Sequence, residues 1–121
     1  MKELCTYTLE VKKSKFIAYF YELESQDEVK DIWQNLKKTH KKARHIPYAY
    51  YFQNSAGKSD DKEPSNTAGT PLYRLLESEK YWNHAIFVVR YFGGIKLGAG
   101  GLMRSYAKCA KEAIYLHQEK K

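Results

Sequence analysis

A glycine-rich segment in the last third of the chain constrains the fold more than any other part of the sequence. Residues 85–92 are apolar or aromatic except for Arg90, which predicts a buried strand. Five of the seven glycines follow within residues 93–101, and helical apolar periodicity begins after them. The segment therefore predicts a strand, a glycine-rich loop and a helix. Such a helix N-terminus can present backbone N–H groups to an anion, or the glycines can simply permit a crowded turn.

The glycine spacing does not match the known nucleotide-binding motifs. The P-loop motif needs Lys and Ser or Thr where Ala99 and Gly100 stand, and the dinucleotide motif needs glycine where Met103 stands. The G-x-x-G spacing resembles the loop of KH domains, but here it follows a strand instead of joining two helices. A glycine-lined helix N-terminus with basic flanks remains. The candidate anion-binding residues are Arg90, Gly93, Gly94, Lys96, Gly98, Gly100, Gly101 and Arg104.

Hydrophobic periodicity in the rest of the chain predicts three more strands and two more helices. Strands are expected over 4–10, 15–23 and 48–52, in addition to 84–90, with a hairpin turn at Lys12-Lys13-Ser14. Ser25 and Glu28 form a capping-box pattern before the first helix. Thr70-Pro71 predicts the start of the second helix, with Thr70 as N-cap. Residues 54–66 are expected to form a polar loop.

This order of elements predicts the fold class. The pattern ββαβαβα is typical of an α/β (α+β) two-layer sandwich, with a mixed four-stranded sheet and helices on one face. A length of 121 residues favours a single domain over 1–121, without a second domain. Two distant cysteines and the lack of a long apolar segment favour a cytoplasmic protein without a membrane partner. The sequence does not indicate the oligomeric state.

The charge distribution favours an anionic partner. The chain carries a net charge of +7, and its basic residues cluster at the end of the first predicted helix. That position alone suits the helix dipole, but the cluster is larger than a helix end requires. We therefore include its members as candidate nucleic-acid contacts. They are Lys37, Lys38, Lys41, Lys42 and Arg44.

The acidic loop that begins at Asp60 suggests a second kind of site. Asp61 or Glu63 could act as a general acid or base, and Arg90 or Lys96 could hold an anion, in a cleft between the Asp60–Thr70 loop and the Gly93–Gly101 loop. The loop lacks the ligand spacing of a calcium site, so we expect neither a metal nor a cofactor.

Three segments together resemble a known family. They are residues 43–50, the run Asp60-Asp61-Lys62-Glu63-Pro64-Ser65-Asn66-Thr67-Ala68-Gly69-Thr70-Pro71, and residues 88–106 with Arg90-Tyr91-Phe92-Gly93-Gly94-Ile95-Lys96-Leu97-Gly98-Ala99-Gly100-Gly101-Leu102. With these motifs, the chain resembles the N-terminal domain of the IMPACT/YigZ family. The sequence departs from the family pattern at Lys62 and Asn66, where glycine is usual. Asn adopts a left-handed backbone more readily than Lys does, so we expect the loop to be shaped differently here.

The resemblance implies a fold like domain 2 of a small-subunit ribosomal protein, with a left-handed βαβ crossover. It also implies an association with translation, although the eukaryotic relatives act through a separate domain that the resemblance does not cover. We therefore expect a non-enzymatic module that binds RNA, the ribosome or translation factors through the basic surface around the glycine-rich loop. The alternatives are an enzyme for a small anionic or phosphorylated substrate, and a purely architectural role for the glycines.

Overall fold

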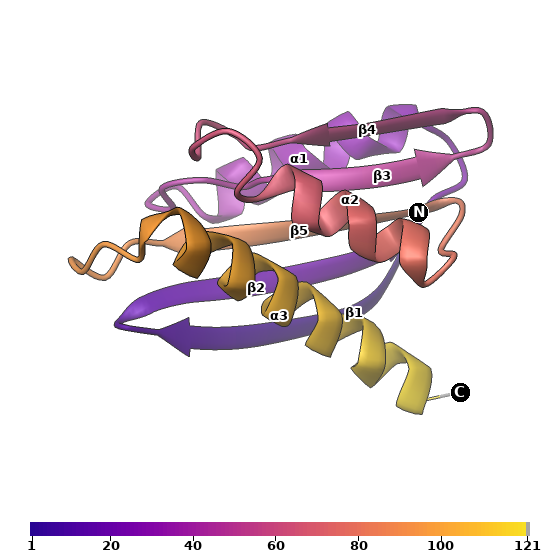
Figure 1. The fold of residues 1–121 in the computed structure, drawn as a ribbon. Helices are drawn as coiled ribbons and strands as arrows, with labels where there is room; N and C mark the ends of the chain where they lie inside the picture. The colour runs from indigo at the N-terminus through magenta and orange to yellow at the C-terminus, as the bar shows by residue number, and fades with distance from the viewer. Residues whose placement is uncertain (121) are drawn as a thin grey trace.

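The computed structural model describes residues 1–120, which form a five-stranded sheet and three helices (Figure 1). The strands are β1 (Lys2–Val11), β2 (Ser14–Glu22), β3 (Tyr48–Phe52), β4 (Ser55–Ser59) and β5 (His84–Tyr91). The helices are α1 (Asp27–Thr39), α2 (Gly69–Ser78) and α3 (Gly98–Glu119). The strands lie in the order β1-β2-β5-β3-β4.

The sheet differs from the prediction in strand number and direction, while the α+β class is confirmed. The expected sheet was mixed and four-stranded, but all four pairs of neighbouring strands are antiparallel and β4 is an additional strand. The prediction missed β4 because its five residues, Ser55–Ser59, lack the apolar alternation of a half-buried strand. β2 and β3 both pair antiparallel with β5, so α1 connects two strands that run in the same direction. The left-handed crossover stays a prediction.

The helices cover both faces of the sheet, so the expectation of helices on one face was wrong. Phe16, Ala18 and Phe20 of β2 belong to a core cluster with residues of α2 and α3. Ile17 on the same strand belongs to a second cluster with Val29, Ile32 and Leu36 of α1. Figure 1 shows α2 and α3 in front of the sheet and α1 behind it. The continuous burial of Ala85 to Arg90 in β5 follows, because a central strand covered on both faces needs no polar side.

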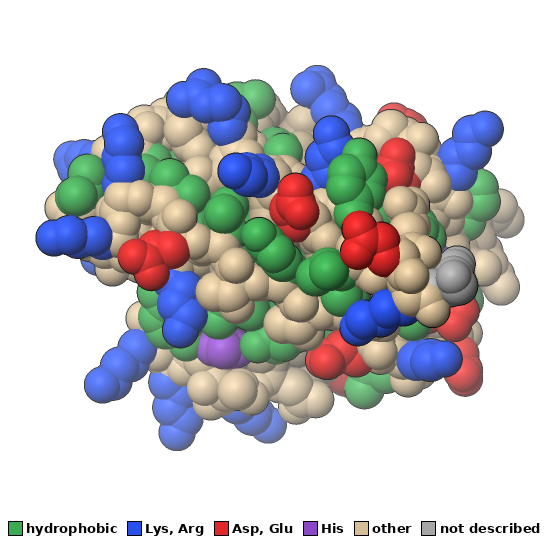
Figure 2. All heavy atoms as spheres, turned by 90° about the horizontal axis from the view of Figure 1, so that it is seen from below, with side chains coloured by type: hydrophobic (Ala, Val, Ile, Leu, Met, Phe, Trp, Pro, Cys, Tyr) green, Lys and Arg blue, Asp and Glu red, His purple; other side chains and the backbone are tan. Residues whose placement is uncertain are grey.

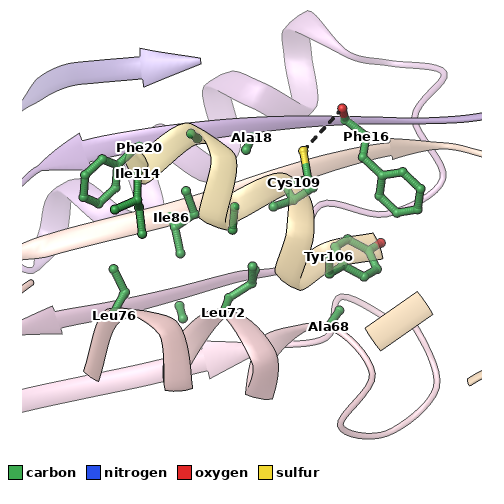
Figure 3. Packing of buried hydrophobic residues seen from close by; sticks show 14 of the residues in the cluster. Phe16, Ala18, Phe20, Ala68, Leu72, Leu76, Ile86, Tyr106, Cys109 and Ile114 are labelled. Carbon is green, nitrogen blue, oxygen red and sulfur yellow. Dashed lines mark hydrogen bonds between the residues drawn. The ribbon is translucent and has the colours of Figure 1, made fainter. Parts of the chain in front are cut away.

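The larger core cluster fixes the position of α3, the helix that follows the glycine-rich loop. The Phe16 and Tyr106 rings meet edge to face with centroids 5.1 Å apart. Cys109 packs beside them, and its thiol donates to the Phe16 carbonyl at 3.5 Å (Figure 3). Burial raises the pKa of the Cys109 thiol to about 12. Cys109 is therefore a packing residue in this core and not an ionised thiol.

One end of the sheet gathers segments that are far apart in the sequence. The β1–β2 turn, the beginning of β3, the end of β5 and the start of α3 all lie at the left of Figure 1. Backbone hydrogen bonds join the segment before β3 to the end of β5: the Arg44 N–H donates to the Arg90 carbonyl at 2.8 Å, and the Arg90 N–H donates to the His45 carbonyl at 2.9 Å. No helix within residues 1–120 is long and apolar enough to cross a membrane.

Candidate functional site

Glu63 lies at the centre of a buried polar network beside the glycine-rich loop. Its side chain is 1% exposed and accepts hydrogen bonds from Arg90 Nε at 2.5 Å, from Arg90 Nη2 at 2.9 Å and from the Tyr106 hydroxyl. His45 Nε2 lies 3.5 Å from Glu63 Oε1. We call Glu63, Arg90, Tyr106 and His45 the Glu63 network. Its members come from the acidic loop, β5, α3 and the segment before β3, so it ties four parts of the chain together.

Glu63 and Arg90 form a buried ion pair, and the pKa shifts in the Glu63 network favour the charged form of Arg90 and the neutral form of Tyr106. Burial acts to lower the pKa of Arg90, but its hydrogen bonds to Glu63 and the carboxylate charge raise that pKa above its ordinary value. Burial and the Glu63 charge both raise the pKa of Tyr106, so its hydroxyl stays protonated and donates. Arg90 is only 7% exposed. Its guanidinium is therefore engaged by Glu63, although Arg90 also lines the cavity between the two loops.

The two aspartates of the acidic loop also have structural partners. Asp60 Oδ1 accepts from the Gly69 N–H at 2.8 Å and from the Ala68 N–H at 3.2 Å, so this carboxylate caps α2 from across the loop. The predicted N-cap, Thr70, was wrong, because Ala68 occupies that position. Asp61 Oδ2 accepts from Lys37 Nζ at 2.6 Å and from the Ile46 N–H at 2.7 Å. Asp61 and Lys37, both candidate functional residues, thus form a salt bridge with one another.

The acidic loop adopts a glycine-type backbone without the family's glycines. Lys62 and Asn66 have φ values of 70° and 64°, in the left-handed region that glycine favours. The expected change of loop shape therefore does not appear in their φ angles: both replacements take the conformation that glycine would hold. For lysine, which has no short polar side chain to stabilise it, this conformation is costly.

The acidic loop and the glycine-rich loop line a common cavity of about 240 Å³. The first loop contributes Glu63 and Pro64, and the second contributes Lys96, Gly98 and Ala99. The predicted cleft between the loops is thus present. Its carboxylate, however, already accepts three hydrogen bonds, and Phe92, Leu97 and Leu102 make most of its remaining wall apolar.

The glycine-rich loop opens an uncapped helix. α3 begins at Gly98, within the glycine-rich segment, Leu97 at its N-cap gives no side-chain hydrogen bond, and its first turn has no acid. Gly98 has a φ of +74°, which a side chain would strain. Gly94, Lys96, Gly98 and Gly100 are exposed, while Gly101 is half-buried.

Exposed basic side chains surround this loop at one end of the molecule. They come from the β1–β2 hairpin, the last turn of α1 and the segment after it, the glycine-rich loop and the first turns of α3. We call this set the basic end: Lys12, Lys13, Lys15, Lys38, Lys41, Lys42, Arg44, Lys96, Arg104 and Lys108. In Figure 2, Lys and Arg dominate the left of the face, while Asp and Glu are more frequent on its right.

The structure sorts the predicted site residues into two groups. Lys96, Arg104, Lys38, Lys41, Lys42 and Arg44 are exposed and belong to the basic end, whereas Arg90 and Lys37 are paired with Glu63 and Asp61. Sequence reasoning missed the hairpin lysines Lys12, Lys13 and Lys15, which the antiparallel pairing of β2 with β5 places beside the glycine-rich loop. The two adjacent lysines in the predicted turn were the available signal.

The fold and the site together define an α+β domain in which a glycine-rich strand-to-helix loop lies beside a buried Glu–Arg pair. The family model described as the Impact N-terminal domain matches residues 12–114, so the chain belongs to the IMPACT family. This membership was predicted from the sequence motifs.

Individual proteins agree with this assignment. The chain is 37% identical over 117 residues to the IMPACT family member YvyE of Bacillus subtilis, covering 94% of this chain and 54% of YvyE. A crystal structure described as a hypothetical protein superposes with a TM-score of 0.87 at 31% identity, covering 95% of this chain and 61% of that one. The two-domain translational regulator Yih1 has the same fold, with a TM-score of 0.57 at 23% identity over 96% of this chain and 46% of Yih1. The chain thus spans about half the length of YvyE.

Proposed function

We propose that this chain is a non-enzymatic module associated with translation, which binds RNA through the basic end. The observation that carries the proposal is the convergence of exposed cations from four separate segments on one end of the sheet. Clustered Lys and Arg displace the counterions that surround a phosphate backbone, and this release drives binding to RNA. The description of the structural relative Yih1 as a translational regulator supports the association with translation. Ribosomal RNA would present the same chemistry on the ribosome.

An exposed aromatic residue strengthens the case for RNA. Phe92 is 38% exposed at the start of the glycine-rich loop, and the Arg44 guanidinium lies 5.0 Å from the centre of its ring. Single-stranded bases stack on aromatic rings and on guanidinium planes. Phosphate contacts from Lys96 and Arg104, with base stacking on Phe92, would suit a structured RNA that has an unpaired loop.

The test is the affinity for a fluorescein-labelled RNA stem-loop of about 16 base pairs, measured against salt. We expect Lys96→Glu with Arg104→Glu to weaken binding by roughly tenfold or more, and to reduce the slope of log K against log salt by about two. The matched control is Lys2→Glu with Lys30→Glu, two reversals of exposed lysines near the opposite end of the molecule. Equal weakening by both pairs would show that only net charge matters and would overturn the proposal.

A second candidate function is catalysis on a small phosphorylated or other anionic substrate in the 240 Å³ cavity between the two loops. The shared lining of this cavity by Glu63 and Lys96 favours it. The engagement of Glu63 by Arg90 and Tyr106 counts against it, because a general acid or base must be able to exchange its proton with substrate. NMR titration with inorganic phosphate and pyrophosphate tests it: saturable shifts confined to the cavity lining would support the enzyme, and their absence would remove it.

A further inference from the structure

The β1–β2 turn holds two consecutive lysines in an unfavourable backbone conformation. Val11 pairs with Ser14, so Lys12 and Lys13 alone form the turn, and their φ values are 47° and 68°. Two-residue hairpins with positive φ at both positions usually contain Asn-Gly or Asp-Gly, which tolerate that geometry. Lysine at both positions is costly for folding. The turn sequence is therefore not the one that hairpin stability alone would select.

The glycine-rich loop packs directly against this turn. A Cβ on Gly93 would lie 2.1 Å from the carbonyl carbon and oxygen of Lys13, so only glycine permits the contact. The Gly93 N–H also donates to the Ser14 hydroxyl at 3.3 Å. Gly93 therefore fixes the lysine turn beside the loop that follows β5, although the two are far apart in the sequence.

The turn forms one wall of a basic hollow against α3. The hollow has a volume of about 260 Å³, and its lining includes Lys12 from the turn and Arg104 and Lys108 from the helix. No acid belongs to the lining, and none of these three cations forms a salt bridge with another residue of the described part of the chain. Ser105 and Gly101 also line the hollow, and Leu9, Val11 and Leu97 make much of its wall apolar. Three cations without an acidic partner around one hollow favour the binding of an anion there.

We propose that the Lys12–Lys13 turn and this hollow are an RNA-backbone contact, in which Lys12, Arg104 and Lys108 surround one phosphate group and Lys13 reaches a neighbouring one. The inference rests on the proposed function and identifies the part of the basic end that contacts the RNA backbone. The hollow is smaller than pockets that enclose drug-sized ligands, which suits a single phosphate of a chain that continues outside. The turn keeps its lysines at a cost in stability because they contact the ligand.

The test separates stability from binding by giving the turn its preferred residues. Lys12→Asn with Lys13→Gly matches the type I′ turn, so we expect the Tm to rise by several degrees while the affinity for the RNA stem-loop falls by roughly tenfold. Lys12→Arg with Lys13→Arg keeps both charges and should keep the affinity. Lys80→Asn is the matched control, because Lys80 also has a positive φ of 58° but precedes β5 at the other end of the molecule. It should raise the Tm without weakening RNA binding.

Lys108→Glu tests the same hollow from α3, independently of the turn, and should weaken RNA binding. If the wild type binds RNA and Lys96→Glu with Arg104→Glu weakens it, but the Asn-Gly turn binds as tightly as the wild type, the inference is overturned and the proposed function stands. If Lys96→Glu with Arg104→Glu weakens binding to the stem-loop no more than the Lys2→Glu, Lys30→Glu control does, the proposed function fails and the inference fails with it.

Discussion

The residues that mark the IMPACT family fall into two sets. We call the buried pair, Glu63 and Arg90, the inward half, and the exposed residues Lys96 and Arg104 the outward half. Arg90 and Glu63 point inward and are nearly inaccessible, with side chains 9% and 1% exposed. Lys96 and Arg104 follow Arg90 within residues 88–106, are exposed, and have no acidic partner among residues 1–120. The difference teaches that neighbouring residues of the family motifs can serve two purposes. The inward half holds the loops in place, and we propose that the outward half binds RNA.

The largest expected effect concerns the inward half. Glu63→Ala leaves the Arg90 guanidinium buried without a counter-charge, so we expect the free energy of unfolding to fall by about 3–5 kcal/mol. Chemical denaturation of the purified variant measures this. Glu63→Leu combined with Arg90→Met removes both charges and should lose much less than the sum of the single changes. A loss below about 1 kcal/mol for Glu63→Ala would contradict the structural role and favour the enzyme.

The outward half should respond in the opposite way. Lys96→Glu with Arg104→Glu alters exposed side chains, so we expect the free energy of unfolding to change by less than about 0.5 kcal/mol while RNA binding weakens. Denaturation and RNA titration on one preparation of the protein check both expectations. A large stability loss here would show that the glycine-rich loop depends on these side chains for its structure, and the two halves would no longer differ.

A smaller effect on stability is expected at Lys62, which precedes Glu63 in the acidic loop. Its φ of 70° suits glycine, so Lys62→Gly relieves the left-handed conformation and should stabilise the chain by up to about 1 kcal/mol. Lys62→Ala is the control, because it removes the same long side chain and charge but keeps the strain. If glycine and alanine give equal stability, the backbone conformation at this position carries no measurable cost.

The smallest expected effect is the pH dependence of stability that arises from protonation of His40. His40 contacts the hydroxyls of Tyr19 at 2.8 Å and Tyr91 at 2.6 Å, and burial, with the charge of Lys15, lowers its pKa. The folded state therefore prefers the neutral ring, and its contribution to stability is lost as the pH falls below the unfolded value of about 6.5. NMR titration should place the His40 midpoint below that value. A midpoint above it would show that the ring is held as a cation.

The sequence predicted the elements that depend on local patterns. Residues 84–90 were predicted as a buried strand, and β5 is indeed covered on both faces. The capping box at Ser25 and Glu28 forms only in part: the Ser25 N–H donates to Glu28 Oε1 at 3.1 Å, but Gln26, not Ser25, is the N-cap of α1. It missed what depends on distant partners. β4 forms through its pairing with β3, where Gly57 lies against the Tyr50 ring, and Asp60 caps a helix from nine residues away. Arg90 looked like an anion-binding residue because its buried partner Glu63 lies 27 positions earlier.

The most direct test of the division between inward and outward halves compares two equal charge removals in one motif. Arg90→Met and Lys96→Met each remove one positive charge, and the salt dependence of RNA stem-loop binding is measured for both at a temperature where circular dichroism shows them folded. We predict that Lys96→Met lowers the slope of log K against log salt by about one and that Arg90→Met, although less stable, leaves it unchanged. An equal reduction of the slope by Arg90→Met would contradict the account.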